Sequence, residues 1–552
     1  MASLRPLLTT SSRENTMAMI PARSVRGGAF APASRIETSL LKYRPLRQPQ
    51  FNRNASTSTS TPASTPPSAS RSLHSSSTAR QAGAALNTTA IPGPAFEGSI
   101  LSDMANKAPL SVLPFITILR SLAVTTMSSS PVLLPPSLSI MSMLAHTTNP
   151  ILNPDRNPIL KQLIKKTFYA QFCAGETGPE VKATMARLRD IGFSGVILGY
   201  AREVVLTQDQ LKSLATNGMD SATAQECIQN EVIPWAKGTL ETVRLAEPGD
   251  YVALKFTGAG RKALWTLSQR LPPPKALASA IDEICTLAAE RGVRLLFDAE
   301  QQAVQAGIDD WTLAYMRKYN NTTPGKAVIY GTYQAYLKAT PAVVAEHLRA
   351  AREDGFTLGV KLVRGAYLGS DPRHLIHDTK ADTDACYDGV AKALLRREWT
   401  GPLAEFATPE DKGADFPGVN MVLASHNADS VRKARAVVDA GHRGTEVAFA
   451  QLQGMADEVS CEILAGRTEG GSGASGASSS SSKVAAAGGD RDAASSQPRA
   501  YKYLVWGSTG ECMKYLLRRA QENKDAVQRT RDGRDAMRSE MWRRLKGVFG
   551  LA

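Results

Sequence analysis

The feature that most constrains this 552-residue chain is a regular alternation of short apolar runs and longer helical patterns from about residue 160 onward. Such alternation is typical of parallel strands joined by helices. A doubly wound open sheet is the structural alternative, but no GxGxxG pattern follows the first run. Eight strand–helix units predict an α/β fold, a distorted (β/α)8 barrel of the TIM type. The runs are 195–200, 251–256, 293–297, 327–332, 358–363, 419–424, 446–450 and 501–506, and helical patterns between them include 273–291, 311–319, 341–354 and 428–440.

The rest of the chain divides by composition. We expect the barrel at 191–545, an N-terminal helical region at 91–190 and a tail at 1–90. Residues 466–499 are mostly Gly, Ser, Ala and Asp, which indicates a flexible insertion before the last strand. Residues 100–150 predict helical segments that either cap the fold, which we favour, or touch a bilayer. No stretch reaches the roughly 18 uninterrupted apolar residues of a spanning helix.

The positive charge of the chain is concentrated in the tail. Residues 1–90 contribute +9 of the formal net charge of +14 through ten Arg and one Lys against two Glu. An Arg-, Ser- and Thr-rich, acid-poor N-terminus is typical of a mitochondrial transit peptide, with a disordered cytosolic tail as the alternative. The rest of the chain carries a net charge of only +5, which gives little reason to expect a nucleic-acid partner. A basic mitochondrial nucleic-acid-binding protein therefore stays a remote alternative.

The six cysteines are scattered through the chain. None forms a CxxC pair or a Cys/His ligand set, so we expect no disulfide and no metal site.

Polar residues recur at the ends of the expected strands, where chemistry gathers in a barrel of this type. Lys255, Asp298, Lys361, His426 and Tyr503 all lie on or just after a strand. Each has an ordinary structural alternative: an N-cap for Asp298, a hydrogen-bonded core side chain for His426, and a solvent-reaching head group for Lys255. Their recurrence at strand after strand favours a functional site.

A helix expected at about 512–524 would bring Tyr515, Arg518, Arg519 and Glu522 together, because residues three and four apart share a helix face. Two adjacent guanidinium groups suit a planar carboxylate, and the glutamate one turn later can hold them in place. The alternative is a solvated, Arg/Glu-rich surface helix.

Several longer motifs occur in a fixed order along the chain. They are FDAEQ at 297–301, TYQAYL at 332–337, KLVRGAY at 361–367, SHN at 425–427, QLQGM at 451–455 and YLLRR at 515–519 followed by Glu522 and Asn523. Over roughly 150–465 and 500–545 the chain resembles the proline dehydrogenase (proline oxidase) family. Residues 128–137 and 153–158 resemble its fungal branch.

The resemblance implies a flavoenzyme. It implies FAD-dependent oxidation of L-proline to Δ1-pyrroline-5-carboxylate, by hydride transfer from proline C5 to flavin N5, with electrons passed to ubiquinone, as the first step of proline catabolism to glutamate. It also implies a mitochondrial protein attached peripherally or monotopically to the matrix side of the inner membrane. A hydroxyproline dehydrogenase or a folate reductase would share the fold. The bulk of Tyr503 favours unsubstituted proline.

The resemblance also assigns roles to residues. Arg518, Arg519 and Lys255 would bind the proline carboxylate, Glu522 would orient the guanidinium groups, Asp298 would help form the closed site, and Tyr503, Tyr515 and Leu452 would pack against the ring. Lys361, Gln334, Val363, Gly365 and Tyr367 would surround the flavin ring, and Lys380, His426 and Asn427 would hold its ribityl, phosphate or adenine parts. Two departures stand out: Val505 lies where the family often has proline, and the segment around Lys380 matches the family pattern only loosely.

Overall fold

A computed structural model describes residues 108–147, 149–202, 225–441, 445–469, 499–523 and 527–549, with backbone only at 467–469, 522–523 and 527–529. All of these residues belong to one compact unit, residues 94–552. The predicted transit peptide and tail, and residues 470–498 of the predicted insertion, lie outside the described residues.

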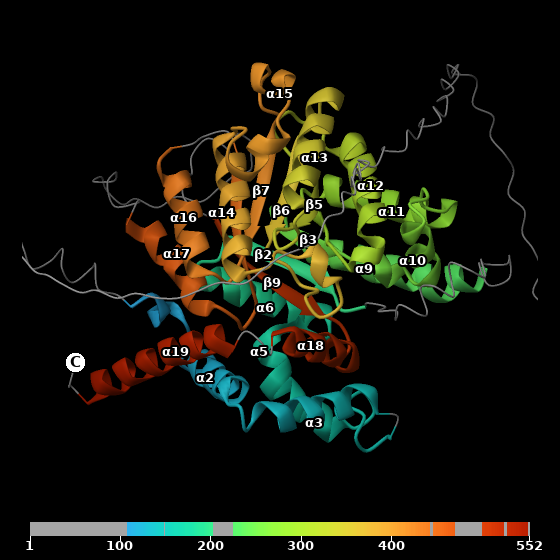
Figure 1. The fold of residues 1–552 in the computed structure, drawn as a ribbon. Coiled ribbons are helices and arrows are strands. Elements are labelled where there is room, and N and C mark those ends of the chain that lie inside the picture. Colours follow the sequence, from blue (N-terminus) through green and yellow to red (C-terminus); the bar gives the residue numbers. More distant parts are fainter. Residues whose placement is uncertain are drawn as a thin grey trace, which may run out of the picture. The chain divides into compact units, whose positions relative to one another are not determined.

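Eight parallel strands close into a barrel with helices around it (Figure 1). Each strand pairs with the next along the chain, and the last pairs with the first, through Gly195↔Tyr501 to Tyr200↔Trp506. The (β/α)8 prediction is therefore confirmed. The strands are β2 (Gly195–Tyr200), β3 (Tyr251–Leu254), β4 (Arg294–Phe297), β5 (Ile329–Gln334), β6 (Leu358–Val363), β7 (Val419–Ala424), β8 (Glu446–Leu452) and β9 (Arg499–Trp506), and a short extra strand β1 (Cys173–Gly175) pairs with the end of β9.

The helices of the barrel follow the strands in sequence. Local signals fix their ends: α14 begins at a capping box made by Thr379 and Asp382, and α13 ends at Gly355 with φ +68°. The helices are α6 (Gly178–Ile191), α9 (Ile233–Leu245), α10 (Arg261–Ser268), α11 (Lys275–Glu290), α12 (Gln302–Tyr319), α13 (Thr340–Asp354), α14 (Lys380–Arg396), α15 (Pro409–Gly413), α16 (Ala428–Asp439), α17 (Asp457–Glu469) and α18 (Thr509–Asn523), with short 3-10 or π turns at η3 (Ile228–Val232), η4 (Phe256–Ala259), η5 (Arg373–Leu375) and η6 (Gly401–Phe406).

Two strands differ from the sequence prediction in ways that matter for the site. β5 begins at Ile329 and not at 327. The Asn320 side chain accepts hydrogen bonds from the backbone N–H groups of Val328, just before the strand, and of Ile329, its first residue. The shift makes Gln334 the last residue of the strand. β3 ends at Leu254, so Lys255 lies just after the strand and not on it.

Apolar side chains fill the space between strands and helices, and a second apolar cluster fills the barrel interior with Tyr251, Tyr330 and Tyr501 among its members. At the N-terminal end of the barrel Glu446 pairs with Arg294 and, at 2.6 Å, with Arg499. In barrels of this type, residues at the N-terminal end stabilise the fold, and the active site lies at the C-terminal end. All six cysteines are buried and none forms a disulfide.

The N-terminal segments pack on the barrel's C-terminal helices. α2 (Phe115–Ser129) lies against α19 (Val527–Val548), where Ile118 and Met537 share an apolar cluster (Figure 1). α3 (Leu134–His146) packs on α18 through Met141 and Leu516. The remaining elements here are η1 (Pro109–Val112), α4 (Pro158–Ile164), η2 (Lys165–Tyr169) and α5 (Ala170–Phe172). In the part of the chain that the structure describes, no helix is long and apolar enough to cross a membrane.

Candidate functional site

A buried carboxylate lies at the centre of the C-terminal mouth of the barrel. Asp298, the residue after β4, is 5% exposed and accepts hydrogen bonds from Lys361 Nζ at 2.6 Å and from the Tyr503 hydroxyl at 3.2 Å. Lys255 Nζ lies 3.5 Å from Oδ2 of Asp298, the oxygen that also accepts from Tyr503. Three strands, β4, β6 and β9, together with the residue after β3, therefore bring these four predicted residues to one point.

The charged groups of this cluster shift one another's pKa values. Burial alone would raise the pKa of Asp298, but the charges of Lys361 and Lys255 outweigh burial, so the pKa lies below its usual value. Burial lowers the pKa of Lys361, and the nearby positive charges of Lys255 and Arg519 act in the same direction. A surplus of cations around one carboxylate is an environment that favours an anionic ligand.

The arginine pair lies on α18, which directly follows β9, and Arg519 is close enough to Lys361 for its charge to act on that lysine's pKa. The guanidinium carbons of Arg518 and Arg519 lie 5.9 and 5.7 Å from the centre of the Tyr515 ring. Tyr503 and Tyr515 both pack against the apolar cluster that joins α3 and α18. The helix predicted from the sequence thus exists and shows the pair with its aromatic neighbour, while the side chain of Glu522 lies outside the described residues.

A second group of predicted residues lies around the ends of β5 and β6. Gln334 ends β5, and its side-chain oxygen accepts a hydrogen bond from the Ala366 N–H at 3.1 Å. Tyr367 is buried and its hydroxyl donates to the Ala299 carbonyl at 3.4 Å. Val363 ends β6, and its carbonyl accepts from the Ala335 N–H at 2.8 Å.

Gly365 lies against this group in a conformation that side chains rarely adopt. Its φ is +147°, and a Cβ there would lie 2.4 Å from the ring of Tyr336. The ring has little freedom to move, because the Tyr336 hydroxyl donates to Asp371 at 2.6 Å. The close approach of backbone and ring therefore depends on glycine.

We expect Gly365→Ala to lower the thermal unfolding midpoint, with a loss of about 1–3 kcal/mol from overpacking and backbone strain. The matched control is Gly369→Ala, four residues later, where an added Cβ meets nothing within 4 Å. Differential scanning fluorimetry of the two variants checks the prediction. Equal midpoints for both would show that the backbone at Gly365 tolerates a side chain.

Buried polar atoms at this mouth fit a polar ring system. Thr332 and Gln334 alternate with Tyr333, whose hydroxyl bonds His347 on the outer helix α13, so both point into the barrel. Thr332 Oγ1 and Gln334 Nε2 are buried and have no hydrogen-bond partner among the described residues. Buried groups of this kind usually have a partner, so a ligand with both acceptors and donors suits this position.

Three predicted residues lie towards the edge of the site. His426 follows β7, and its Nε2 accepts a hydrogen bond from the Leu452 N–H at 3.1 Å, so the neighbouring strand end holds the ring in place. Asn427 caps α16, accepting from the Ser430 N–H at 3.1 Å. Lys380 is 75% exposed and pairs with Asp384 at 2.6 Å, so the structure does not bring it into the buried cluster.

Sequence reasoning missed several residues that shape the site. Thr332 faces the barrel interior beside Lys361, since the two residues are paired in the β5–β6 register. Asp371 fixes Tyr336 and also accepts from the Gln302 N–H at 3.0 Å. Strand alternation could have indicated Thr332 once the strand was placed. The Tyr336–Asp371 pair has no sequence signal, because the two residues are 35 positions apart and lie in different loops, after β5 and after β6.

Comparison with known proteins places this geometry in a family. A family model described as proline dehydrogenase matches residues 181–532. The probable mitochondrial proline dehydrogenase of Schizosaccharomyces pombe is 28% identical over 426 residues, covering 69% of this chain and 80% of that protein. The mitochondrial proline dehydrogenase 1 of Arabidopsis thaliana is 26% identical, covering 71% and 76%. A protein called hydroxyproline dehydrogenase in Xenopus laevis is also 28% identical, covering 69% and 78%.

Among solved structures, proline utilization A from Bdellovibrio bacteriovorus aligns with a TM-score of 0.48 and 16% identity. The alignment covers 77% of this chain and 40% of that longer chain. The match of the family model spans well over half of the sequence, including all eight barrel strands and α18. This chain therefore belongs to the proline dehydrogenase family.

Proposed function

We propose that this chain oxidises L-proline to Δ1-pyrroline-5-carboxylate with FAD as cofactor and ubiquinone as electron acceptor, the first step of proline catabolism to glutamate. The observation that carries the proposal is the buried cluster of Asp298, Lys361, Lys255 and Tyr503 next to the arginine pair of α18. A buried cationic cluster beside aromatic side chains suits a small amino acid whose carboxylate must be held while its ring reacts.

Residues around the ends of β5 and β6 would hold FAD. When bound, the flavin would supply at its N5 the acceptor for a hydride from proline C5. The buried unpartnered polar atoms of Gln334 and Thr332 and the close backbone approach at Gly365 support this position. The proposed contacts are Lys361, Gln334, Val363, Gly365 and Tyr367 to the ring system, and Lys380, His426 and Asn427 to the ribityl, phosphate or adenine parts.

The substrate would be held from two sides. Arg518 and Arg519, with Lys255, would bind the carboxylate, and Glu522 would orient the guanidinium groups. Tyr503, Tyr515 and Leu452 would pack against the ring and exclude water. Asp298 anchors Lys255, Lys361 and Tyr503, so it acts as a positioning residue for both halves of the site.

Hydroxyproline is the second candidate substrate, because relatives called hydroxyproline dehydrogenase in Xenopus laevis and Homo sapiens match this chain at 28% identity. In this chain the Tyr503 ring is held by two neighbours: Lys361 Nζ lies 5.2 Å from the ring centre, and the Tyr503 hydroxyl donates to Asp298. A ring fixed in this way leaves little room for a substituent on the substrate. We therefore favour unsubstituted proline.

We expect Tyr503→Ala to raise the ratio of kcat/KM for trans-4-hydroxy-L-proline to that for L-proline by about tenfold or more, since a removed ring makes room for a hydroxyl. Tyr503→Phe is the matched control, because it keeps the ring and removes the hydroxyl that donates to Asp298. Steady-state kinetics with both amino acids and a water-soluble dye check the prediction. An unchanged ratio in Tyr503→Ala would show that another side chain sets ring specificity.

The function itself is tested by product formation. Purified full-length protein carrying FAD is incubated with L-proline and a dye acceptor, and pyrroline-5-carboxylate is trapped with o-aminobenzaldehyde and measured by its colour. We expect product in proportion to the dye reduced. Dye reduction without trapped product, or neither, would overturn the proposed reaction.

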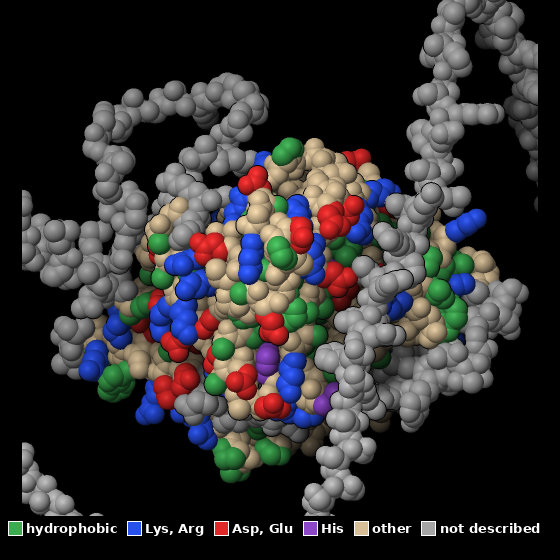
Figure 2. All heavy atoms as spheres, turned by 45° about the horizontal axis from the view of Figure 1, so that its top comes forward, with side chains coloured by type: hydrophobic (Ala, Val, Ile, Leu, Met, Phe, Trp, Pro, Cys, Tyr) green, Lys and Arg blue, Asp and Glu red, His purple; other side chains and the backbone are tan. Residues whose placement is uncertain are grey.

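We further propose that the protein is mitochondrial and attached peripherally or monotopically to the matrix side of the inner membrane. Relatives from Schizosaccharomyces pombe, Arabidopsis thaliana and Dictyostelium discoideum carry mitochondrial names. Among the described residues, all exposed large apolar side chains except Leu271 and Leu368 lie in residues 112–163 or 542–549. Figure 2 shows hydrophobic side chains at the lower edge of the molecule, below the mixed charges of the barrel.

A further inference from the structure

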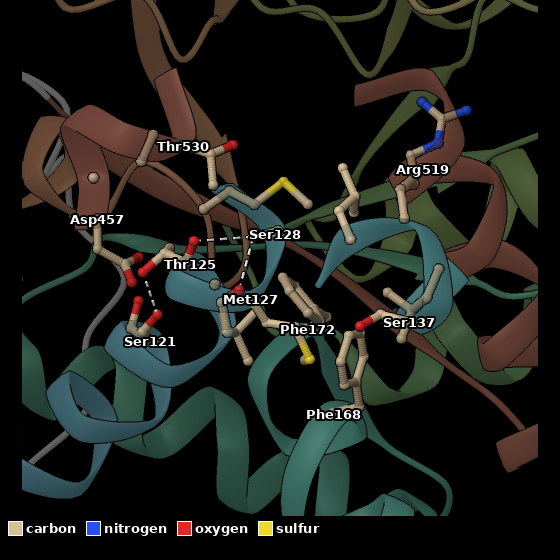
Figure 3. Close-up of a pocket in the computed structure, with 18 of the residues that line it drawn as sticks. Ser121, Thr125, Met127, Ser128, Ser137, Phe168, Phe172, Asp457, Arg519 and Thr530 are labelled. Carbon is tan, nitrogen blue, oxygen red and sulfur yellow. Dashed lines mark hydrogen bonds between the residues drawn. The ribbon is translucent and has the colours of Figure 1, made fainter. Parts of the chain in front are cut away.

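A cavity of about 160 Å³ lies between the N-terminal helices and the mouth of the barrel (Figure 3). Its walls come from α2, α3, η2, α5, α17, α18 and α19 and from the residues that follow β7 and β8. Among the described residues that line it, only His426 and Arg519 also belong to the site described above.

The lining of the cavity is chiefly apolar. Met127, Leu138, Met141, Phe168 and Phe172 supply large flexible or aromatic side chains. The hydroxyls of Thr125 and Ser128 donate within their own helix, to the carbonyls of Ser121 and Val124 at 2.7 Å each. Cavities of about 150 Å³ with apolar walls hold a benzene-sized ring. The space therefore suits an uncharged six-membered ring with apolar substituents.

The cavity lies between the predicted substrate site and an exposed apolar surface on α2 and α3. In Figure 3 the guanidinium of Arg519 lies at the edge of the cavity and points away from Phe168 and Phe172. The charge of Arg519 also acts to lower the pKa of Lys361, so Arg519 lies near the predicted substrate site as well. On the other side, the helices that form the wall expose Ile116, Leu119 and Ile140 to solvent, at 63, 44 and 53%. Exposed apolar side chains that gather on neighbouring helices mark a surface that binds another protein or a membrane.

We propose that this cavity is the binding site for the lipid-soluble benzoquinone that accepts the electrons of the reaction, an inference that rests on the proposed function. The quinone ring occupies the space next to Phe168 and Phe172, and its apolar tail leaves between α2 and α3. In one turnover L-proline loses a hydride from C5 and a proton from its nitrogen. The quinone gains the same two electrons and two protons and becomes the hydroquinone, and FAD returns to its starting state.

The test fills the cavity without touching the substrate site. Ser137 lines the cavity on α3, and its hydroxyl donates to the Leu133 carbonyl at 2.7 Å. Ser137→Trp places an indole in the space. The matched control is Ser139→Trp on the same helix, where an exposed serine outside the cavity donates in the same way to the Pro135 carbonyl at 3.1 Å. If Ser137→Trp does not fold, Ser128→Leu replaces it as the test variant, because Ser128 lines the opposite wall of the cavity on α2.

Two readouts are taken on full-length protein carrying FAD. The first is the dissociation constant of a decyl-tailed benzoquinone, measured by calorimetry on the oxidised protein without proline. The second is the rate of L-proline oxidation with that quinone and with a water-soluble dye. We expect Ser137→Trp to weaken quinone binding and raise its KM by about tenfold or more, with the dye rate within about twofold of wild type. Ser139→Trp should change neither.

The outcomes separate the two proposals. If Ser137→Trp and Ser128→Leu bind the quinone as wild type does while proline still reduces the dye, the quinone site is wrong and the proposed function stands. If proline reduces neither acceptor in the wild type, both proposals are overturned.

Discussion

Replacing Arg519 with methionine is expected to reduce kcat/KM for L-proline by about 10²- to 10³-fold, because loss of one partner of a buried charge pair costs about 3–4 kcal/mol. Arg519 lies close enough to Lys361 for its charge to lower that lysine's pKa, so it belongs to the same cationic site. Most of the loss should fall on KM if the arginine binds ground state and transition state equally well. Steady-state kinetics with a dye acceptor measure both constants.

The control for this variant is Arg538→Met, an exposed arginine on α19. We expect it to leave both constants within about twofold of wild type, as surface changes usually do. Thermal unfolding of both variants separates loss of binding from loss of fold. If Arg519→Met kept the wild-type KM and kcat, the arginine pair would be a surface feature and the carboxylate clamp would be wrong.

Asp298→Asn is expected to destabilise the fold by about 3–5 kcal/mol, because it leaves the buried cation of Lys361 without its counter-charge. The same change releases Lys255 and Tyr503, so we also expect L-proline oxidation to fall strongly. Denaturant or thermal unfolding measures the first effect, and dye-linked kinetics the second. Asp378→Asn is the control, since Asp378 also pairs with a lysine, at 3.2 Å, but its side chain is 78% exposed.

The pH dependence of this variant follows from the direction of the pKa shift. The pKa of Asp298 in the folded protein lies below its usual value, because Lys361 and Lys255 outweigh burial. Its contribution to stability is therefore complete above the unfolded-state pKa of about 4 and is lost as the pH falls through the folded-state value. The stability gap between wild type and Asp298→Asn should narrow below about pH 4. A gap that stayed constant would show that the carboxylate is not ionised in the folded protein.

The fold could be predicted because its signal is local. Each strand is a short apolar run flanked by turn residues, and each helix carries its own periodicity, so eight units could be counted without knowing any contact. The start of β5 was less accessible: the strand begins at Ile329, two residues later than predicted, where the Asn320 side chain binds the backbone N–H groups of Val328 and Ile329. That shift decided whether Gln334 ends the strand or follows it.

The site could be predicted only in part. Asp298, Lys361, Lys255 and Tyr503 converge because barrel strands bring their ends together, a consequence of topology that a sequence can foresee. Asp371 and Tyr336 meet through a loop contact that no periodicity encodes. The cavity beneath α2 and α3 is also a product of packing, since its lining comes from segments more than 400 residues apart, such as Ser121 and Met537. Lys380, taken from the family pattern, lies at the surface in an ion pair.

The central claim is that this protein binds FAD and that L-proline reduces it. The most direct measurement is the visible spectrum of the purified protein, recorded without oxygen or any acceptor before and after addition of L-proline. We expect a flavin band that L-proline bleaches and that trans-4-hydroxy-L-proline leaves unchanged. Bleaching by hydroxyproline alone would contradict the substrate assignment, and a protein that stayed colourless after addition of FAD would contradict the flavoenzyme proposal itself.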